Sequence, residues 1–331
     1  MVNTVNLLVT TTLNEASLKR IKNVSKRIKL TDVSKLVQAE QKGDTEARKR
    51  LDAFLAEAEV IYGFRLPENL IARAPKLKWF QTMSAGVDRY LNDDFSKSPV
   101  TLTSVSGIHS VPIGEFVLGL MLMFAKQAPL AFQQKLQRQW KPFLAMELRS
   151  KTVGIVGLGN IGSEVARLAR AFGMRVVATR RSAGRSQRAR YVDRLFAPDQ
   201  LRRLLAESDF VVLTLPLTRE THRIIGEAEL RSMKPAAYLI NIARGSLIDE
   251  EALVRALEER RIAGAGLDVF SREPLPADSP LWGFTNVIIS PHIAGGMEEY
   301  VQRATAVFVE NLRRYLAGKR LVNVVDKVRG Y

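Results

Sequence analysis

Short apolar runs alternate with amphipathic helical patterns over the first hundred residues of the chain. The apolar runs predict strands at 6–10, 59–64, 77–83 and 99–105. Between them, apolar residues at helical spacing predict helices at 16–28, 45–58 and 67–76. Repetition of strand, helix and strand predicts right-handed crossovers and a parallel sheet. No glycine-rich phosphate fingerprint lies in this part of the chain.

The stretch KTVGIVGLGNIG, at 151–162, predicts a buried parallel strand, a tight turn and then a helix that continues through 163–172. The turn carries Gly157, Gly159 and Gly162 in the spacing G-x-G-x-x-G, which in this setting is a dinucleotide fingerprint. Gly157 permits the tight turn, Gly159 lets backbone N–H groups approach a pyrophosphate, and Gly162 lets the helix pack closely. The alternative is a strand-to-helix turn that binds no ligand.

The rest of the chain continues the same alternation around this fingerprint. Further strands are predicted at 174–182, 210–216, 236–243, 263–270 and 286–292. An apolar helical segment interrupted at Pro129 covers 110–137, and we expect its middle to be buried. A final helix over 298–317 returns to the first domain, where 321–326 adds a strand.

This order of elements predicts an α/β fold with two domains. Residues 1–104 and 297–331 are predicted to form one domain, and residues 105–296 a Rossmann-type dinucleotide-binding domain inserted into it. The length of 331 residues suits two domains of ordinary size.

Cysteine is absent, which excludes disulfides, thiolate metal sites and cysteine nucleophiles. We predict no metal site. The N-terminal stretch lacks a basic region followed by a cleavage site, and no run of about 18 apolar residues occurs. We therefore expect a cytoplasmic protein without a membrane segment.

The formal net charge of +16 raises the question of a nucleic-acid or membrane partner. The basic residues fall in two separate stretches: six lie between Lys19 and Lys29, and eleven arginines lie between Arg167 and Arg203. No zinc-finger spacing, RNP-like aromatic motif or basic heptad region accompanies them. We expect a solvated basic surface, partly suited to an anionic cofactor, and no specific nucleic acid or membrane.

Cofactor choice depends on the end of the strand that follows the fingerprint helix. NAD-binding folds usually carry Asp or Glu about 20 residues after the glycines. Here Arg180 stands in that place, with Thr179, Arg181 and Ser182 beside it. A guanidinium binds a 2′-phosphate that a carboxylate would repel. The sequence therefore predicts a preference for NADP(H), with NAD(H) as the other cofactor; the alternative is that these arginines are solvated surface.

Three polar residues follow predicted strands of the second domain: Arg244, Glu273 and His292. Carboxyl ends of parallel strands meet at the edge where ligands bind, so we expect these side chains in one crevice. A histidine serves as general acid or base near neutral pH, and a neighbouring carboxylate fixes its tautomer. An arginine binds a carboxylate through its planar fork. Beside a nicotinamide, this set can move a hydride and a proton.

A turn of small residues, SAGVD at 84–88, directly follows the strand predicted at 77–83. Such a turn leaves backbone N–H groups free to bind an anion at the ligand-binding edge of the sheet. By itself it fits an ordinary helix start equally well.

The motifs resemble those of the D-isomer-specific 2-hydroxyacid dehydrogenase family. The resemblance runs in family order through GIVGLGNIG, LTLPLTRETHRII, LINIARGSLIDEEAL, GAGLDVFSREPLP and VIISPHIAGG, with a fainter match at MSAGVD. It implies a flavodoxin-like substrate domain, a Rossmann-type domain and assembly as a homodimer.

The resemblance also implies a role for each matching residue. Arg244 would hold the substrate carboxylate and keto oxygen, His292 would exchange a proton with the substrate oxygen, and Glu273 would pair with His292. Asp268 would orient the nicotinamide carboxamide, and the N–H groups of Ala85 and Gly86 would receive the substrate carboxylate. The cofactor contacts are expected from Gly157, Gly159, Asn160, Ile161, Gly162, Thr179, Arg180, Arg181, Pro216 and Thr218.

With arginine at position 180, the chain resembles the NADPH-dependent glyoxylate and hydroxypyruvate reductases of the family. The resemblance implies reduction of such a small 2-keto acid to the D-2-hydroxy acid. One alternative is a dehydrogenase of phosphoglycerate, formate or phosphonate. The other is a nicotinamide-sensing dimeric scaffold, as the family's transcriptional corepressors are.

The sequence does not identify the side chain of the substrate. The candidates for lining its pocket are Met83, Phe143, Leu144, Arg65 and Trp282. We expect His109 to pack under the apolar helix rather than to touch substrate, because lone histidines near apolar helices are usually structural.

Overall fold

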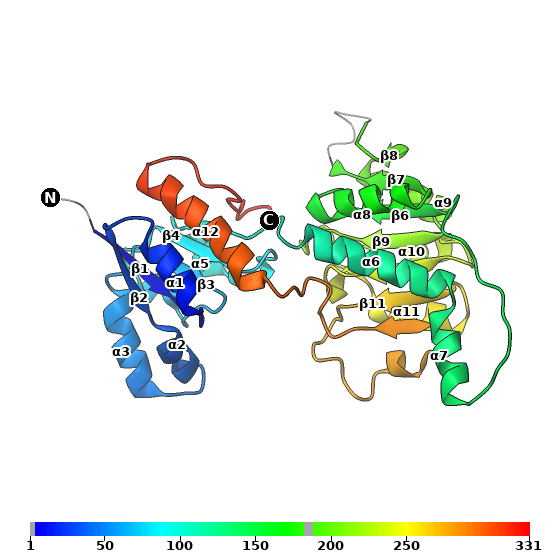
Figure 1. The fold of residues 1–331 in the computed structure, drawn as a ribbon, viewed down its shortest axis with the longest axis horizontal. Helices are drawn as coiled ribbons and strands as arrows, with labels where there is room; N and C mark the ends of the chain where they lie inside the picture. Colours follow the sequence, from blue (N-terminus) through cyan, green and yellow to red (C-terminus); the bar gives the residue numbers. More distant parts are fainter. Residues whose placement is uncertain (1–3, 182–187) are drawn as a thin grey trace. The chain divides into compact units, whose positions relative to one another are not determined.

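The computed structural model describes residues 4–181 and 188–331, and the chain divides into two compact units. Unit 1 combines Met1–Ile108 with Met297–Tyr331, and unit 2 is His109–Gly296. Each unit is an α/β domain with a parallel sheet, and unit 2 is inserted into unit 1 (Figure 1). The predicted fold class is confirmed. Ser182, expected beside Arg180, lies outside the described residues.

Unit 1 is built on a five-stranded parallel sheet in the order β2-β1-β3-β4-β5, which is the flavodoxin-like order. Its strands are β1 (Val5–Val9), β2 (Ile28–Asp32), β3 (Val60–Gly63), β4 (Trp79–Thr82) and β5 (Thr101–Thr103). One face packs against α1 (Glu15–Lys22) and α12 (Tyr300–Leu316). The other is covered by α2 (Ser34–Glu40), α3 (Thr45–Leu55), α4 (Leu70–Arg73) and α5 (Asp93–Lys97).

The helix predicted over 16–28 is wrong in its second half. The α1 helix begins behind Asn14, whose Oδ1 accepts a hydrogen bond from the N–H group of Ser17 (2.9 Å), and it ends at Lys22. Ile28–Asp32 forms the edge strand β2 and pairs with β1 over five residues. Only Ile28 of this strand is buried, so its apolar pattern is weak and the pairing with β1 decides its conformation.

The strand predicted over 321–326 is also absent. This segment makes a single antiparallel bridge, between Val324 and Thr103 of β5. Its other anchor is Asn311 of α12, whose side chain accepts a hydrogen bond from the N–H group of Val322 (2.7 Å).

Unit 2 is built on a seven-stranded parallel sheet in the order β12-β11-β10-β9-β6-β7-β8. The strands are β6 (Thr152–Val156), β7 (Arg175–Thr179), β8 (Arg194–Phe196), β9 (Phe210–Leu213), β10 (Tyr238–Asn241), β11 (Gly264–Leu267) and β12 (Val287–Ile289). The order reverses between β6 and β9, which places the turn after β6 at the topological switch point. The three-residue strand β8 escaped the sequence prediction because it is too short to show a pattern.

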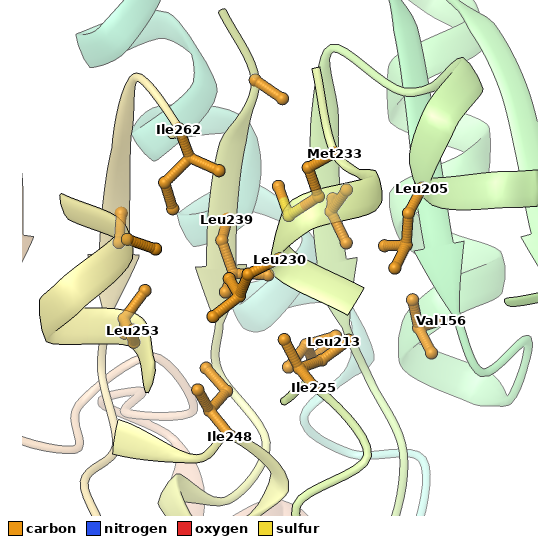
Figure 2. Close-up of a cluster of buried hydrophobic side chains, with 14 of the residues drawn as sticks. Val156, Leu205, Leu213, Ile225, Leu230, Met233, Leu239, Ile248, Leu253 and Ile262 are labelled. Atoms are coloured by element: carbon orange, nitrogen blue, oxygen red, sulfur yellow. The ribbon is translucent and has the colours of Figure 1, made fainter. Parts of the chain in front are cut away.

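Helices cover both faces of the second sheet. On one face α6 (Ser110–Ala125) and α8 (Asn160–Ala171) share a core with the strands. On the other face the core is shared with α9 (Leu201–Glu207), α10 (Glu227–Ser232) and α11 (Glu250–Glu258). Figure 2 shows this second core, where Leu205, Leu230 and Leu253 from the helices gather near strand residues such as Leu213 and Leu239.

The apolar segment 110–137 breaks two residues before Pro129. Gln127 adopts a left-handed φ of 51°, and Pro129 lies in the first turn of α7 (Ala128–Leu136). In the part of the chain that the structure describes, no single helix is long and apolar enough to cross a membrane. Within the described residues, α6 and α7 are the one helix pair that together has the length and composition, and that pair is bent by 63°.

Candidate active site

The glycine turn after β6 is shaped by two positions that exclude a side chain. Gly157 has a φ of +103°, and its N–H group donates to Thr179 Oγ1 of β7 (3.1 Å). A Cβ at Gly162 would lie 2.3 Å from the carbonyl oxygen of Gly157. At Gly159, by contrast, nothing lies within 4 Å of an added Cβ, and its N–H group donates to no described residue. The turn therefore presents open backbone at the start of α8, where a pyrophosphate binds in such folds.

Arg180 lies at the end of β7, where its N–H group donates to the carbonyl oxygen of Phe196 (3.2 Å). Its side chain is half-buried, and no described residue accepts a hydrogen bond from its buried Nε. A buried N–H group without an acceptor is costly, and a phosphate oxygen would satisfy it. Arg181 follows on the surface.

Arg180 differs from its basic surroundings. Five arginines of the stretch 167–203 form ion pairs, namely Arg167 with Glu164, Arg170 with Asp193, Arg175 and Arg194 with Glu207, and Arg202 with Glu229. Much of the positive charge in this stretch is therefore balanced locally. Arg180 forms no ion pair with a described residue.

The segment after β9 lies at the same switch point. The N–H group of Thr214 donates to the carbonyl oxygen of Val156, at the end of β6 (3.0 Å). Further along, Thr221 Oγ1 donates to the carbonyl oxygen of Pro216 (2.7 Å) and accepts from the N–H group of Thr218 (2.8 Å). These bonds hold the predicted cofactor contacts Pro216 and Thr218 in an ordered turn near the fingerprint. Asn160 and Ile161 are the first two residues of α8.

His292 and Glu273 form a hydrogen-bonded pair. His292 Nδ1 lies 2.8 Å from Glu273 Oε2, and the other carboxylate oxygen of Glu273 accepts from the N–H group of Phe270 (3.1 Å). The two side chains are 52% and 37% exposed, so a substrate can reach them. Because Nδ1 faces the carboxylate, Nε2 is the ring nitrogen left for chemistry.

Asp268 has a structural task that the sequence does not reveal. The residue is 1% exposed, and its carboxylate accepts three hydrogen bonds, from the hydroxyl of Ser290 (2.6 Å) and the N–H groups of Ile293 (2.8 Å) and Ala294 (2.9 Å). Its carbonyl oxygen accepts from the N–H group of His292 (2.9 Å). These bonds hold the loop that carries His292 and stabilise the left-handed φ of 55° at that residue.

Arg244 follows β10 and is positioned by the fully buried Asn241. The Asn241 side chain donates to the carbonyl oxygen of Arg244 (2.8 Å) and accepts from the N–H group of Ala243 (3.1 Å). At the next residue, Gly245, an added Cβ would lie 1.9 Å from the carbonyl carbon of Phe270. The loop carrying Arg244 therefore touches the backbone that leads to Glu273.

The structure brings Arg244, Glu273 and His292 to the carboxyl ends of three neighbouring strands, β10, β11 and β12. All three lie in unit 2 with the glycine turn. The fork of Arg244 can bind a carboxylate, and the histidine can exchange a proton with an adjacent oxygen. No group of three metal-ligating side chains occurs among the described residues.

Ala85 and Gly86 lie in unit 1, in the turn after β4. Neither of their N–H groups donates to any residue in the described ranges. The turn is held on both sides: the N–H group of Ser84 donates to Thr82 Oγ1 (3.0 Å), and the carbonyl oxygen of Met83 accepts from Tyr300 Oη. Sequence reasoning missed Tyr300, which lies 217 residues away along the chain.

His109 stands at the start of α6 and is half-buried, and this burial lowers its pKa. Its ring lies beside Gly295, where an added Cβ would be 3.0 Å from His109 Cδ2. The ring therefore packs between the first turn of α6 and the segment that follows His292.

Comparison with known proteins is consistent with this site. Residues 118–294 match the family described as D-isomer specific 2-hydroxyacid dehydrogenase, NAD binding domain. The glyoxylate/hydroxypyruvate reductase B of Pectobacterium carotovorum is 39% identical over 295 residues, which cover 83% of this chain and 90% of that protein.

Two solved structures resemble the whole chain. The D-isomer specific 2-hydroxyacid dehydrogenase of Xanthobacter autotrophicus, in complex with NADPH and MES, has a TM-score of 0.84 at 29% identity and covers 99% of this chain and 100% of its own. The NADPH-dependent glyoxylate/hydroxypyruvate reductase of Sinorhizobium meliloti, in complex with NADP and sulfate, has a TM-score of 0.82 at 26% identity with the same coverage.

Proposed function

The chain belongs to the D-isomer specific 2-hydroxyacid dehydrogenase family, and on that premise we propose that it is an NADPH-preferring reductase of small 2-keto acids such as glyoxylate and hydroxypyruvate. The product is the D-2-hydroxy acid. The observation that carries the proposal is the His292–Glu273 pair, in the same unit as Arg244, the glycine turn and Arg180. The names of the similar reductases and the NADPH or NADP bound to the two solved relatives support it.

The residues of unit 2 fit a bound NADP(H) molecule. Gly159 and the start of α8, with Asn160 and Ile161, would receive the pyrophosphate, and Arg180 with Arg181 would receive the 2′-phosphate. Pro216 and Thr218 would line the cofactor. A carboxylate has about four acceptor positions and Asp268 uses three, so one is left for the nicotinamide carboxamide. The bound cofactor supplies the hydride.

The chain's own groups then control the charge and the proton. In unit 2, Arg244 would bind the substrate carboxylate and polarise the keto oxygen. In unit 1, the N–H groups of Ala85 and Gly86 are the proposed carboxylate-binding groups. His292 would donate the Nε2 proton to the carbonyl oxygen as the alcohol forms. Glu273, at Nδ1, stabilises the protonated ring before the transfer and keeps its orientation afterwards.

Replacing Arg180 with aspartate tests the cofactor assignment. We expect the ratio of kcat/KM with NADPH to kcat/KM with NADH to fall by about tenfold or more, because the carboxylate repels a 2′-phosphate. Steady-state reduction of glyoxylate with each cofactor measures it. Arg203→Asp, an exposed site on α9, is the matched control.

A ratio within about twofold of wild type would show that Arg180 is only surface. Wild-type protein that binds NADPH tightly but reduces no 2-keto acid in a panel would support the scaffold alternative. Activity confined to phosphoglycerate, formate or phosphonate would support the other dehydrogenases.

We also propose a homodimer that uses α7 and the segment after it. Large apolar side chains are unusually exposed there: Leu136 is 85%, Leu144 90% and Trp140 96% exposed. The segment is nevertheless ordered, since the N–H group of Lys141 donates to Gln134 of α7 (3.3 Å). A second copy of the chain would cover these side chains.

Light scattering coupled to size exclusion tests the assembly. Wild-type protein is expected at twice the chain mass of 37.0 kDa, and the double variant Leu136→Glu with Trp140→Glu at the chain mass. Charges introduced at a buried apolar interface are costly, so the dimer should dissociate. Wild-type protein at the chain mass would refute the proposal.

A further inference from the structure

Unit 1 contains a cavity of about 340 Å³ at the carboxyl ends of β3 and β4. It opens between the segment that begins at Phe64 after β3 and the segment that runs from Arg89 into α5. The volume lies at the lower end of the range for small-molecule pockets, about 300–1,000 Å³. In open α/β sheets this is also the edge at which ligands bind.

Arg89 is held rigidly at the rim of this cavity. Its guanidinium carbon lies 3.9 Å from the ring centroid of Phe64 and 4.7 Å from that of Tyr90. Its Nη2 donates to Tyr90 Oη (2.6 Å) and to the carbonyl oxygen of Phe64 (3.4 Å). Tyr90 is fixed in turn, because its hydroxyl donates to the same carbonyl oxygen (2.8 Å).

The charge of Arg89 has no acidic partner within the described ranges. Among the described residues, no carboxylate oxygen lies within 4.0 Å of its guanidinium, and none accepts a hydrogen bond from its Nε or Nη1. Exposed arginines usually pair with a carboxylate or extend freely into water. Arg89 is immobilised on two rings, but its charge is not neutralised by a carboxylate. Its side chain has already lost conformational entropy, so binding an anion costs less.

A second arginine lines the same cavity. Arg65 is held by Gln41, whose Oε1 accepts from Arg65 Nη1 (2.9 Å), and it too lacks an ion-pair partner among the residues described. Two acidic residues also line the cavity. Glu68 is committed to Arg48 (3.2 Å), whereas Asp94 in the first turn of α5 forms no ion pair with a described residue. The rim therefore keeps an excess of positive charge.

The cavity is lined by the segment that follows β3 and by residues from Arg89 onward, and the turn proposed to bind the substrate carboxylate precedes Arg89 in the same segment. In the sheet Gly63 of β3 pairs with Thr82 of β4, so the segments that follow these strands start side by side. Arg89 comes three residues after Gly86, which limits the separation of their Cα atoms to about 11 Å. The charged side chain of Arg89 therefore belongs to the same short segment as the turn, and its guanidinium lies over the Phe64 ring at the start of the neighbouring segment.

We propose that this cavity receives the second carboxylate of a 2-keto dicarboxylic acid, and that Arg89 is the residue that determines this specificity. The inference rests on the proposed function, because the first carboxylate is taken to bind at the Ala85–Gly86 turn of the same unit. The two aromatic rings orient the guanidinium, and Arg65 adds a second positive charge. Glyoxylate has no side chain and makes no contact with this cavity.

The test compares two four-carbon acids that differ in the second carboxylate, oxaloacetate and 2-oxobutyrate. We expect Arg89→Gln to lower the ratio of kcat/KM for oxaloacetate to kcat/KM for 2-oxobutyrate by about tenfold. This is the effect of losing one charge-assisted hydrogen bond. A ratio of two substrates on one enzyme is unaffected by loss of folded protein. Arg50→Gln, an exposed arginine of α3 in the same unit, should leave the ratio unchanged, and Arg89→Lys should retain part of it.

If the oxaloacetate to 2-oxobutyrate ratio of Arg89→Gln stays within about twofold of the wild-type ratio, the inference is overturned. Reduction of glyoxylate by the same proteins would still support the proposed function. If no 2-keto acid consumes NADPH, the proposed function fails, and calorimetric titration with oxaloacetate decides the cavity separately. Binding that weakens about tenfold in Arg89→Gln would still support the cavity site. Equal binding by the variant and wild type would overturn it.

Discussion

Replacing His292 with asparagine is expected to lower kcat for glyoxylate reduction by about a thousandfold while the affinity for NADPH stays unchanged. Asparagine retains a polar group that can face Glu273, but it has no proton to give to the carbonyl oxygen. Hydride transfer would then have to form an alkoxide without a proton donor. Loss of NADPH absorbance measures turnover, and a fluorescence titration measures cofactor binding.

His222→Asn is the matched control for this variant. His222 is exposed and lies in the polar turn after β9, where its N–H group donates to the carbonyl oxygen of Thr218 (3.0 Å). We expect its turnover to remain near that of wild type. Near-normal turnover in His292→Asn would show that His292 is not the acid–base group. The proposed role of Glu273 as its partner would then also be wrong.

Replacing Gly245 with alanine is expected to destabilise the protein by about 2–3 kcal/mol and to reduce turnover strongly. The added Cβ would lie 1.9 Å from the carbonyl carbon of Phe270 and 2.4 Å from the nitrogen of Ser271. Both neighbours are backbone atoms, so no side-chain rotation relieves the overlap. The loop of Arg244 and the loop of Glu273 must move apart, which separates the proposed carboxylate-binding group Arg244 from Glu273, the partner of the proposed proton donor His292.

Gly283→Ala is a matched control for the same chemical change, because nothing lies within 4 Å of its added Cβ. Chemical denaturation gives the free energy of unfolding of both variants, and steady-state kinetics gives their turnover. Equal stability and equal activity of the two variants would show that the close approach at Gly245 is not required.

Local features explain why much of the site can be predicted from the sequence. The glycine turn needs particular backbone angles and close approaches at Gly157 and Gly162, and these requirements leave a recognisable spacing. Arg244, Glu273 and His292 each follow an apolar strand, and parallel strands bring their carboxyl ends to one edge. Once the strands are recognised, the grouping of the three side chains follows from topology.

Other features depend on partners that are distant in the sequence. The edge strand β2 is a strand because β1 supplies its hydrogen bonds, although its own pattern is that of a charged helix. Asp268 holds the loop of His292 through bonds to residues 22 to 26 positions away, and Tyr300 reaches the turn after β4 from the far end of the chain. No local pattern marks such contacts.

The sequence by itself determined the parallel α/β architecture, the dinucleotide turn, the arginine in place of the NAD-selecting acid and the three residues of the proposed chemistry. Backbone angles, strand periodicity and charge are properties of short segments, so they are visible along the chain. Only the tertiary structure decided which carboxylate holds the histidine loop, which of the described arginines lack an acidic partner and where the cavity after β3 and β4 lies. These depend on distances between segments that folding alone brings together.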